Sequence, residues 1–171
     1  MLGSVARDLV ARAHTTTVLV GPEYLGTALG EGNAEVLLWC WDGSPGAERM
    51  EETVIEWAAA LHLRVEVATV LHRHGTYLGD LPADNVRAGA RAAVDRLRAA
   101  GISCDPVELN GLDVARAITD HAHVIRPAIV AAGATAQRDS RGATRLFRIV
   151  LGTTSERIVR HSPAPVLLGH P

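Results

Sequence analysis

Apolar runs alternate with segments of helical periodicity along most of this chain. The near-continuous apolar run that begins at Glu35 predicts a strand buried on both faces, and the run stops at Asp42. Ser44 can cap a helix and Pro45 suits the first helical position, after which apolar residues recur at helical spacing as far as Leu61. The pattern therefore predicts a strand that passes through a tight turn into a helix.

The same alternation continues through the rest of the sequence. It predicts strands at about 63–72, 102–109, 128–133 and 166–168, and helices at about 83–100, 113–123 and 154–161. Pro106 cannot donate to a strand ladder, so the strand at 102–109 is expected at a sheet edge. The order from residue 35, β-α-β-α-β-α-β-α-β, predicts an α/β fold with a doubly wound parallel sheet and helices on both faces. Ligands of such sheets bind beyond the carboxyl ends of the strands, which directs attention to the turns after Asp42 and Gly133.

Composition narrows the class of protein. The 171 residues are 47% hydrophobic with a formal net charge of -2, which fits one globular domain and gives no basic field for nucleic acid. No apolar run approaches the ~20 residues that span a bilayer, and Arg7, Asp8 and Arg12 lie where a signal peptide needs an apolar core. We therefore expect a cytoplasmic protein without nucleic-acid or membrane partners. The two cysteines, Cys40 and Cys104, lie in apolar stretches and are expected to be buried and reduced.

A glycine pattern follows the strand predicted at 128–133. Gly142 and Gly152 are separated by nine residues, and Thr153 follows directly. Together with the DGSP turn at 42–45 and the closing segment LGTTSERIVRHSPAPVLL, this pattern resembles the universal stress protein family over about residues 35–169. The resemblance implies a five-stranded parallel sheet of order 3-2-1-4-5 and, as in nucleotide-binding members, a pocket for an adenine nucleotide such as ATP. Mg²⁺ is expected only together with ATP.

The resemblance also implies which residues form the pocket. Asp42 would contact the adenosine part, Val70 would lie near the base, and Gly133 would line the floor. Glycines allow backbone amides close to phosphate oxygens, and the N-terminus of a helix favours an anion. Thr153 with Glu156 is also a capping box, which stabilises a helix without any ligand. The expected nucleotide-binding residues are Trp41, Asp42, Val70, Gly133, Gly142, Gly152, Thr153, Thr154 and Ser155.

Two features depart from the family pattern. Asp139 stands where the pattern has its first glycine, and Gly133 matches better, which leaves six extra residues (139 minus 133) in the loop. A longer loop can fold back and present residues 140–142 to phosphate, or it can fill the pocket. Trp41 is bulkier than the residue usual in the family, and its indole can either stack on adenine or occupy the space of the base.

Other chemistry is weakly indicated. Among the eight histidines, His72 and His74 lie two apart at a strand end, and His121 and His123 lie about 200° apart around a helix. No cysteine or carboxylate stands at ligand spacing beside them, so no metal site is expected. Arginines at 138, 141, 145 and 148 fit a solvated face better than a phosphate site. No catalytic triad can be assigned from residue order, so a catalytic role is not favoured.

Three functions remain open at this point. The first is a stress-response regulatory protein with an adenine-nucleotide pocket, functional or degenerate, that acts through dimerisation. The second is an enzyme of the adenine-nucleotide alpha-hydrolase-like group that acts on ATP. The third is an interaction module that binds no nucleotide.

The beginning of the chain repeats its end. Residues 2–21, LGSVARDLVARAHTTTVLVG, share a short helical pattern and an apolar strand ending in Gly with residues 151–169, LGTTSERIVRHSPAPVLLG. Universal stress domains often occur in tandem, so residues 1–21 resemble the end of a preceding domain, with 22–34 as linker and 35–171 as a complete domain. A lone strand exposes its edge, so Thr16 to Val20 should dock beside the last strand, within the chain or across a dimer. A homodimer or tandem-like pairing is therefore expected through Val166, Leu167 and Leu168.

Overall fold

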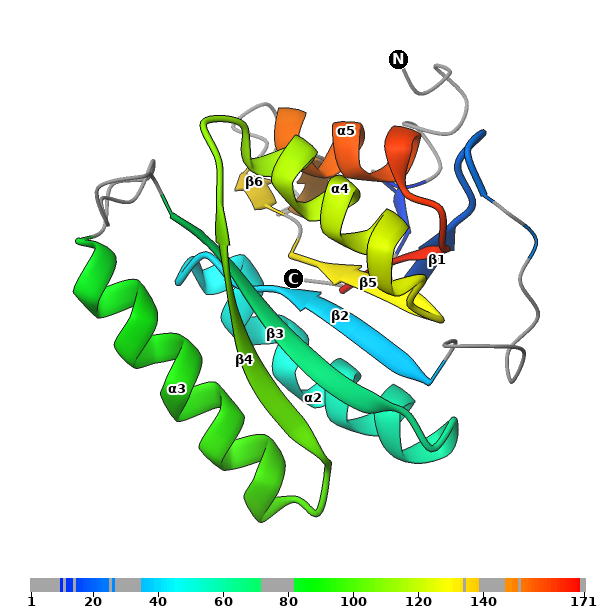
Figure 1. Cartoon of the computed structure of the whole chain (residues 1–171). Helices are drawn as coiled ribbons and strands as arrows, with labels where there is room; N and C mark the ends of the chain where they lie inside the picture. Colours follow the sequence, from blue (N-terminus) through cyan, green and yellow to red (C-terminus); the bar gives the residue numbers. More distant parts are fainter. Residues whose placement is uncertain are drawn as a thin grey trace.

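The computed structural model describes residues 10, 12–13, 15–24, 26, 35–71, 82–133, 135–138, 147–150 and 152–169, with only the backbone for 135–138 and 147–150. Its elements are drawn in Figure 1. In chain order they are β1 (Thr17–Leu19), β2 (Val36–Cys40), α2 (Pro45–Ala60), β3 (Arg64–Leu71), α3 (Ala83–Ala99), β4 (Cys104–Asn110), α4 (Val114–Ile125), β5 (Ile129–Ala132), β6 (Thr135–Arg138), β7 (Phe147–Val150), α5 (Thr153–His161) and β8 (Val166–Leu168). Within the described residues, no helix is long and apolar enough to cross a membrane.

A six-stranded sheet of order β1-β8-β5-β2-β3-β4 forms the centre of the fold. The strands β8, β5, β2, β3 and β4 are parallel, and counted among themselves in chain order they give the predicted arrangement 3-2-1-4-5. The α/β class and the doubly wound topology are therefore confirmed. Pro106 lies in β4, which is the edge strand as predicted.

Helices cover both faces of the sheet, as Figure 1 shows. The helices α2 and α3 pack on one face, where Met50 and Leu97 join a core cluster that contains Trp39 of β2. The helices α4 and α5 pack on the other face, where Ile118 and Ile158 join a second cluster. Because successive strand residues point to opposite faces, a strand covered on both sides must be apolar throughout, and β2 is.

The predicted helix starts follow from their caps. Ser44 Oγ accepts from the Ala47 amide at 3.2 Å, and Pro45 occupies the first position of α2. Asp113 likewise caps α4, because its Oδ1 accepts from the Arg116 amide at 3.1 Å. Each of these helices directly follows a parallel strand, so its capped N-terminus lies at the carboxyl end of the sheet.

Two details differ from the sequence predictions. The helix α5 begins at Thr153 with Gly152 as its N-cap, and no side chain in the described part of the chain caps it, so the alternative of a Thr153–Glu156 capping box is wrong. The strands β6 and β7 form an antiparallel hairpin that the polar composition of this region did not reveal. Residues 139–146, which include the expected site residue Gly142, lie outside the described residues.

The docking of the first strand is confirmed, and it occurs within the chain. Thr17 pairs with Leu168, Val18 with Leu167 and Leu19 with Val166, in antiparallel orientation. This pairing makes β1 the sixth strand and fills the outer edge of β8, through which dimerisation was expected.

Candidate functional site

A cavity of about 220 Å³ opens at the carboxyl ends of β2, β3 and β5. The strand order reverses beside β2, which is the place where doubly wound sheets bind ligands. Two helices, α4 and α5, close the cavity from one side. Its lining consists of Cys40, Trp41, Asp42, Ala68, Val70, Val114, Ile118, Ala132, Gly133, Thr154, Ser155 and Ile158.

The structure brings most of the expected site residues together. The lining includes six of them, namely Trp41, Asp42, Val70, Gly133, Thr154 and Ser155. Gly152 and Thr153 lie at the start of α5, beside this lining but not in it. Gly142 lies outside the described residues.

The N-terminus of α5 supplies the polar end of the cavity. No side chain of the described residues caps this helix, so the amides of its first turn keep their capacity to bind an anion. Ser155 Oγ donates to the Gly133 carbonyl at 3.2 Å and thereby ties α5 to the end of β5. A Cβ at Gly152 would meet no atom of the described residues within 4 Å, apart from its chain neighbours, so the space beside this residue is open.

Gly133 is required by packing at the floor of the cavity. A Cβ at this position would lie 2.7 Å from Ala47 N and 2.7 Å from Gly46 C, which are backbone atoms of the first turn of α2. The absence of a side chain therefore lets β5 end directly against α2. This role is independent of a ligand.

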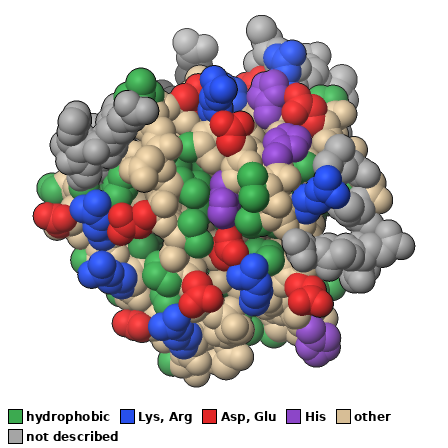
Figure 2. Space-filling view, in the orientation of Figure 1, with side chains coloured by type: hydrophobic (Ala, Val, Ile, Leu, Met, Phe, Trp, Pro, Cys, Tyr) green, Lys and Arg blue, Asp and Glu red, His purple; other side chains and the backbone are tan. Residues whose placement is uncertain are grey.

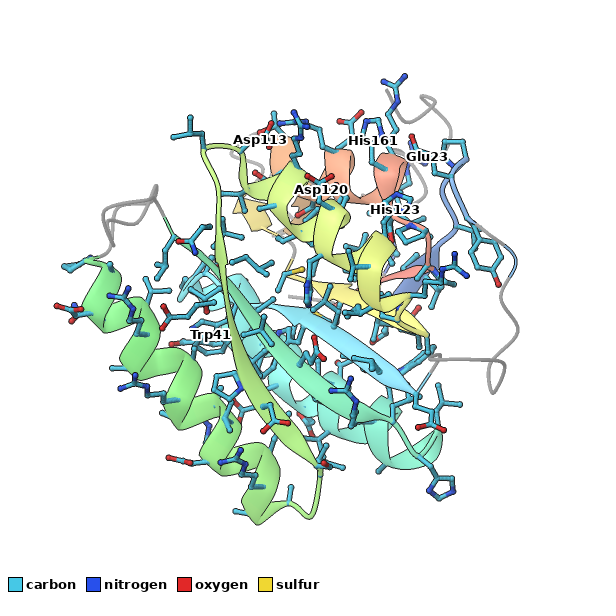
Figure 3. All side chains as sticks on the ribbon, in the orientation of Figure 1. Glu23, Trp41, Asp113, Asp120, His123 and His161 are labelled. Atoms are coloured by element: carbon cyan, nitrogen blue, oxygen red, sulfur yellow. The ribbon has the colours of Figure 1, made fainter. Side chains whose placement is uncertain are left out.

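The indole of Trp41 lies on the other face of the sheet, contrary to both sequence alternatives. The residue is 3% exposed and belongs to the core cluster under α2 and α3. Its ring meets Trp39 edge to face with centroids 5.1 Å apart, and its Cζ2 lies 3.2 Å from where a Cβ of Gly89 would be. Figure 3 labels Trp41 on this side. Trp41 thus belongs to the cavity lining, but its ring packs in the core cluster and does not fill the cavity, so we assign the indole no contact with a base.

The alternation of β2 gives the cavity Cys40 and Asp42 instead. Sequence reasoning missed Cys40, although the two-residue period that pairs it with Asp42 was available. Burial and the negative charge of Asp42 raise the pKa of the Cys40 thiol to about 12, so it stays protonated and is a poor nucleophile. Asp42 Oδ1 accepts from the Ser44 amide at 2.9 Å, which holds the carboxylate in place. The remaining lining is mostly apolar, so the site combines apolar walls with one carboxylate and a helix N-terminus.

An ion pair joins α4 and α5 near their N-terminal ends. The Arg157 guanidinium binds both carboxylate oxygens of Asp113, at 2.9 and 2.6 Å. Hydrogen bonds from Arg157 and from the Arg116 amide hold the pKa of Asp113 below its usual value. The pair links the start of α4 to the middle of α5, and its partly exposed side chains make it a modest contribution to helix packing.

A second cavity of about 260 Å³ lies between α4, α5 and the segment after β1. Figure 3 labels four of its polar residues, Glu23, Asp120, His123 and His161. Glu23 Oε1 lies 2.7 Å from His161 Nδ1, and Glu23 Oε2 lies 3.8 Å from His123 Nε2. Histidine and acidic side chains also lie close together near the top of the face in Figure 2. These contacts join the N-terminal segment to both helices.

Of the other histidines and arginines considered from sequence, the structure describes the side chain of His121. His121 Nε2 lies 2.9 Å from the buried Glu66 carboxylate, which also binds Arg64. His72 and His74 lie outside the described residues, as do the side chains at 138, 141, 145 and 148. Among the described residues, no group of three side chains is placed to hold a metal ion.

Comparisons with known proteins identify the family and agree with the fold. A model of the universal stress protein family matches residues 35–170. A universal stress protein from Archaeoglobus fulgidus has a similar structure, with a TM-score of 0.69 and 21% identity over 99% of this chain and 56% of that chain. A universal stress protein in complex with cAMP has a TM-score of 0.60 and 21% identity over 80% of this chain and 97% of that chain. The Archaeoglobus fulgidus universal stress protein in complex with dAMP has a TM-score of 0.58 and 18% identity over 78% of this chain and 95% of that chain. This chain thus spans about half of the first of these structures, and no curated protein matches it.

Proposed function

Because the chain belongs to the universal stress protein family, we propose that it is a stress-response regulatory protein whose cavity binds an adenine nucleotide. The observation that carries this proposal is the position of the uncapped α5 N-terminus, beside an apolar cavity at the switch point of the sheet. Two similar structures, in complex with cAMP and with dAMP, add support from the same fold. A cytoplasmic location is part of the proposal.

The dimensions of the cavity suit the nucleoside part of the ligand. Small-molecule sites usually measure about 300–1,000 Å³, and this cavity of about 220 Å³ lies just below that range. The base would lie against Val70, and Asp42 would accept a hydrogen bond from the adenosine part. The phosphates would extend to the α5 amides beside Gly152, Thr153 and Thr154, with Gly142 of the preceding loop as a further contact. The described lining has one carboxylate, so Mg²⁺ would accompany ATP through the phosphates and not through a protein-built site.

Calorimetric titration of the full chain with ATP, AMP, adenosine and GTP tests the proposal. We expect adenine nucleotides to bind and Asp42→Asn to weaken them about tenfold, because a charged acceptor is lost while the turn to Ser44 keeps its acceptor oxygen. Asp95→Asn is the matched control, since Asp95 is exposed on α3 away from the cavity. Absence of adenine-nucleotide binding up to ~1 mM, or equal affinities of the two variants, would overturn the assignment.

The same samples distinguish the other two functions. Conversion of bound ATP to defined products would place the protein among enzymes of the adenine-nucleotide alpha-hydrolase-like group. A protein that binds no nucleotide but is purified with another chain would be an interaction module. We further propose that residues 1–21 derive from the end of a preceding domain and that 22–34 are a linker. Self-association would use Val166, Leu167 and Leu168 once β1 has left this edge of β8.

A further inference from the structure

The strand β1 has nearly the same sequence as the strand with which it pairs. Aligned on their final glycines, residues 18–21 read Val-Leu-Val-Gly and residues 166–169 read Val-Leu-Leu-Gly. The first set therefore corresponds to the second residue by residue. Within the sheet, β1 occupies the place that a second copy of β8 would take.

The register makes this replacement symmetric. Val18 lies opposite Leu167, and Leu19 lies opposite Val166. When each β1 residue is exchanged for its counterpart in β8, Val166 of one copy faces Leu167 of the other, and the reverse holds equally. A two-fold axis then passes between positions 166 and 167, within the strand itself. Such a pairing is isologous and closes at two copies.

The glycine at the end of the repeated segment is required by the same site. A Cβ at Gly21 would collide with the backbone carbonyl of Val159 in α5, which cannot move aside. The counterpart of Gly21 in a second copy is Gly169. Within its own chain, a Cβ at Gly169 would meet the side chain of Met50, a flexible group. Glycine is therefore required more strictly at the position that Gly21 occupies beside α5. Both Gly21 and its counterpart Gly169 meet this requirement.

The N-terminal segment has further anchors that β8 of a second copy lacks. Glu23 lies between His161 and His123 on α5 and α4, and Val10 is 2% exposed in the core cluster under these helices. The segment is also attached to the domain, so it meets the edge at a high effective concentration. Both effects favour β1 over a partner strand.

We propose that β1 is an internal substitute for β8 of a second copy and prevents the chain from forming a two-fold dimer. Release of β1 exposes an edge that pairs with the same edge of another molecule, through Val166, Leu167 and Leu168. This inference develops the self-association named in the proposed function, and it does not depend on nucleotide binding.

Analytical ultracentrifugation of the full chain, combined with hydrogen exchange of the β1 and β8 amides, tests this proposal. Two substitutions release β1 by different contacts: Gly21→Val collides with α5, and Glu23→Arg replaces the carboxylate between the two histidines by a cation. Asp95→Arg is the matched charge reversal on an exposed position of α3. Circular dichroism identifies a variant that fails to fold, in which case the other one decides.

The wild type and Asp95→Arg should have the mass of one chain and a protected β1. The releasing variants should show exposed β1 amides and twice the mass at high concentration. The β8 amides on the edge opposite β5 should be protected in the dimer and lose this protection on dilution, while those bonded to β5 stay protected. A variant that exposes β1 but keeps the mass of one chain at every concentration would overturn the proposal. So would a wild-type dimer in which β1 stays protected. The nucleotide titration, repeated on the same variants, reports separately on the cavity.

Discussion

The contact between β5 and α2 predicts a large effect of a small substitution. In Gly133→Ala the added Cβ would lie 2.7 Å from two backbone atoms, Ala47 N and Gly46 C. Because these atoms cannot rotate away, β5 or α2 must shift, and overpacking of this kind costs about 1–3 kcal/mol. In a chain of this size 1 kcal/mol lowers Tm by about 2–4 °C, so we expect a fall of about 2–12 °C.

Gly152→Ala is the matched control for this substitution. The backbone of Gly152 has φ −62° and ψ 158°, which alanine adopts readily, and apart from its chain neighbours no described residue has an atom within 4 Å of an added Cβ. We expect this variant to be as stable as the wild type or to gain about 0.4–1 kcal/mol from the stiffer unfolded chain. Urea unfolding monitored by far-UV circular dichroism measures both variants, with the m-value compared for each. A Gly133→Ala protein with the wild-type midpoint would refute the packing argument.

Three further outcomes are expected. Arg157→Gln should raise the carboxyl pKa of Asp113 toward its usual value, as measured by an NMR titration. In the wild type the pKa of Asp113 is lower in the folded state than in the unfolded state. The ion pair therefore stabilises the fold fully above the unfolded pKa, and this stabilisation is lost as the pH falls through the folded pKa. Burial raises the thiol pKa of Cys40 to about 12 and of Cys104 to about 11, so at about pH 8 iodoacetamide should label both thiols only after denaturation, as counted by mass spectrometry. Trp41→Phe should lower the free energy of unfolding in urea by about 1–3 kcal/mol. The nucleotide Kd should stay within about twofold of the wild type, because the indole packs away from the cavity. A much larger Kd in a folded variant would contradict this placement.

The parallel sheet could be predicted because its signals are local and strong. The strand β2 is apolar throughout, and the Ser44-Pro45 pair marks the start of α2, so both elements follow from a few neighbouring residues. The hairpin of β6 and β7 has strands of four residues each, and β6 reads Thr-Ala-Gln-Arg. So short and polar a segment has no periodicity that separates a strand from a loop.

The site could be predicted in position but not in the direction of each side chain. The strand order places the residues after β2 and β5 at the cavity, whatever their side chains do. The period of two groups Trp39 with Trp41 and Cys40 with Asp42, but it does not say which pair faces which helices, since both faces of β2 are covered. The indole of Trp41 packs against Gly89 of α3, which has no side chain in the way. Gly89 is remote in sequence, so this contact could not be foreseen.

The pairing of β1 with β8 could be predicted because an unpaired strand edge is energetically unfavourable in any sheet. An unpaired strand edge must be covered, and a strand that resembles another one fits the same neighbour. Choosing between one chain and two requires the contacts beyond the strand, namely Gly21 against α5 and Glu23 between His123 and His161. These contacts lie at the C-terminal ends of α4 and α5, whereas the cavity lies at their N-terminal ends. The helices α4 and α5 therefore contribute to two separate sites, the cavity and the contacts with the N-terminal segment. For a substitution in either helix, both nucleotide binding and the protection of β1 must be measured, so that its effect can be assigned to one site.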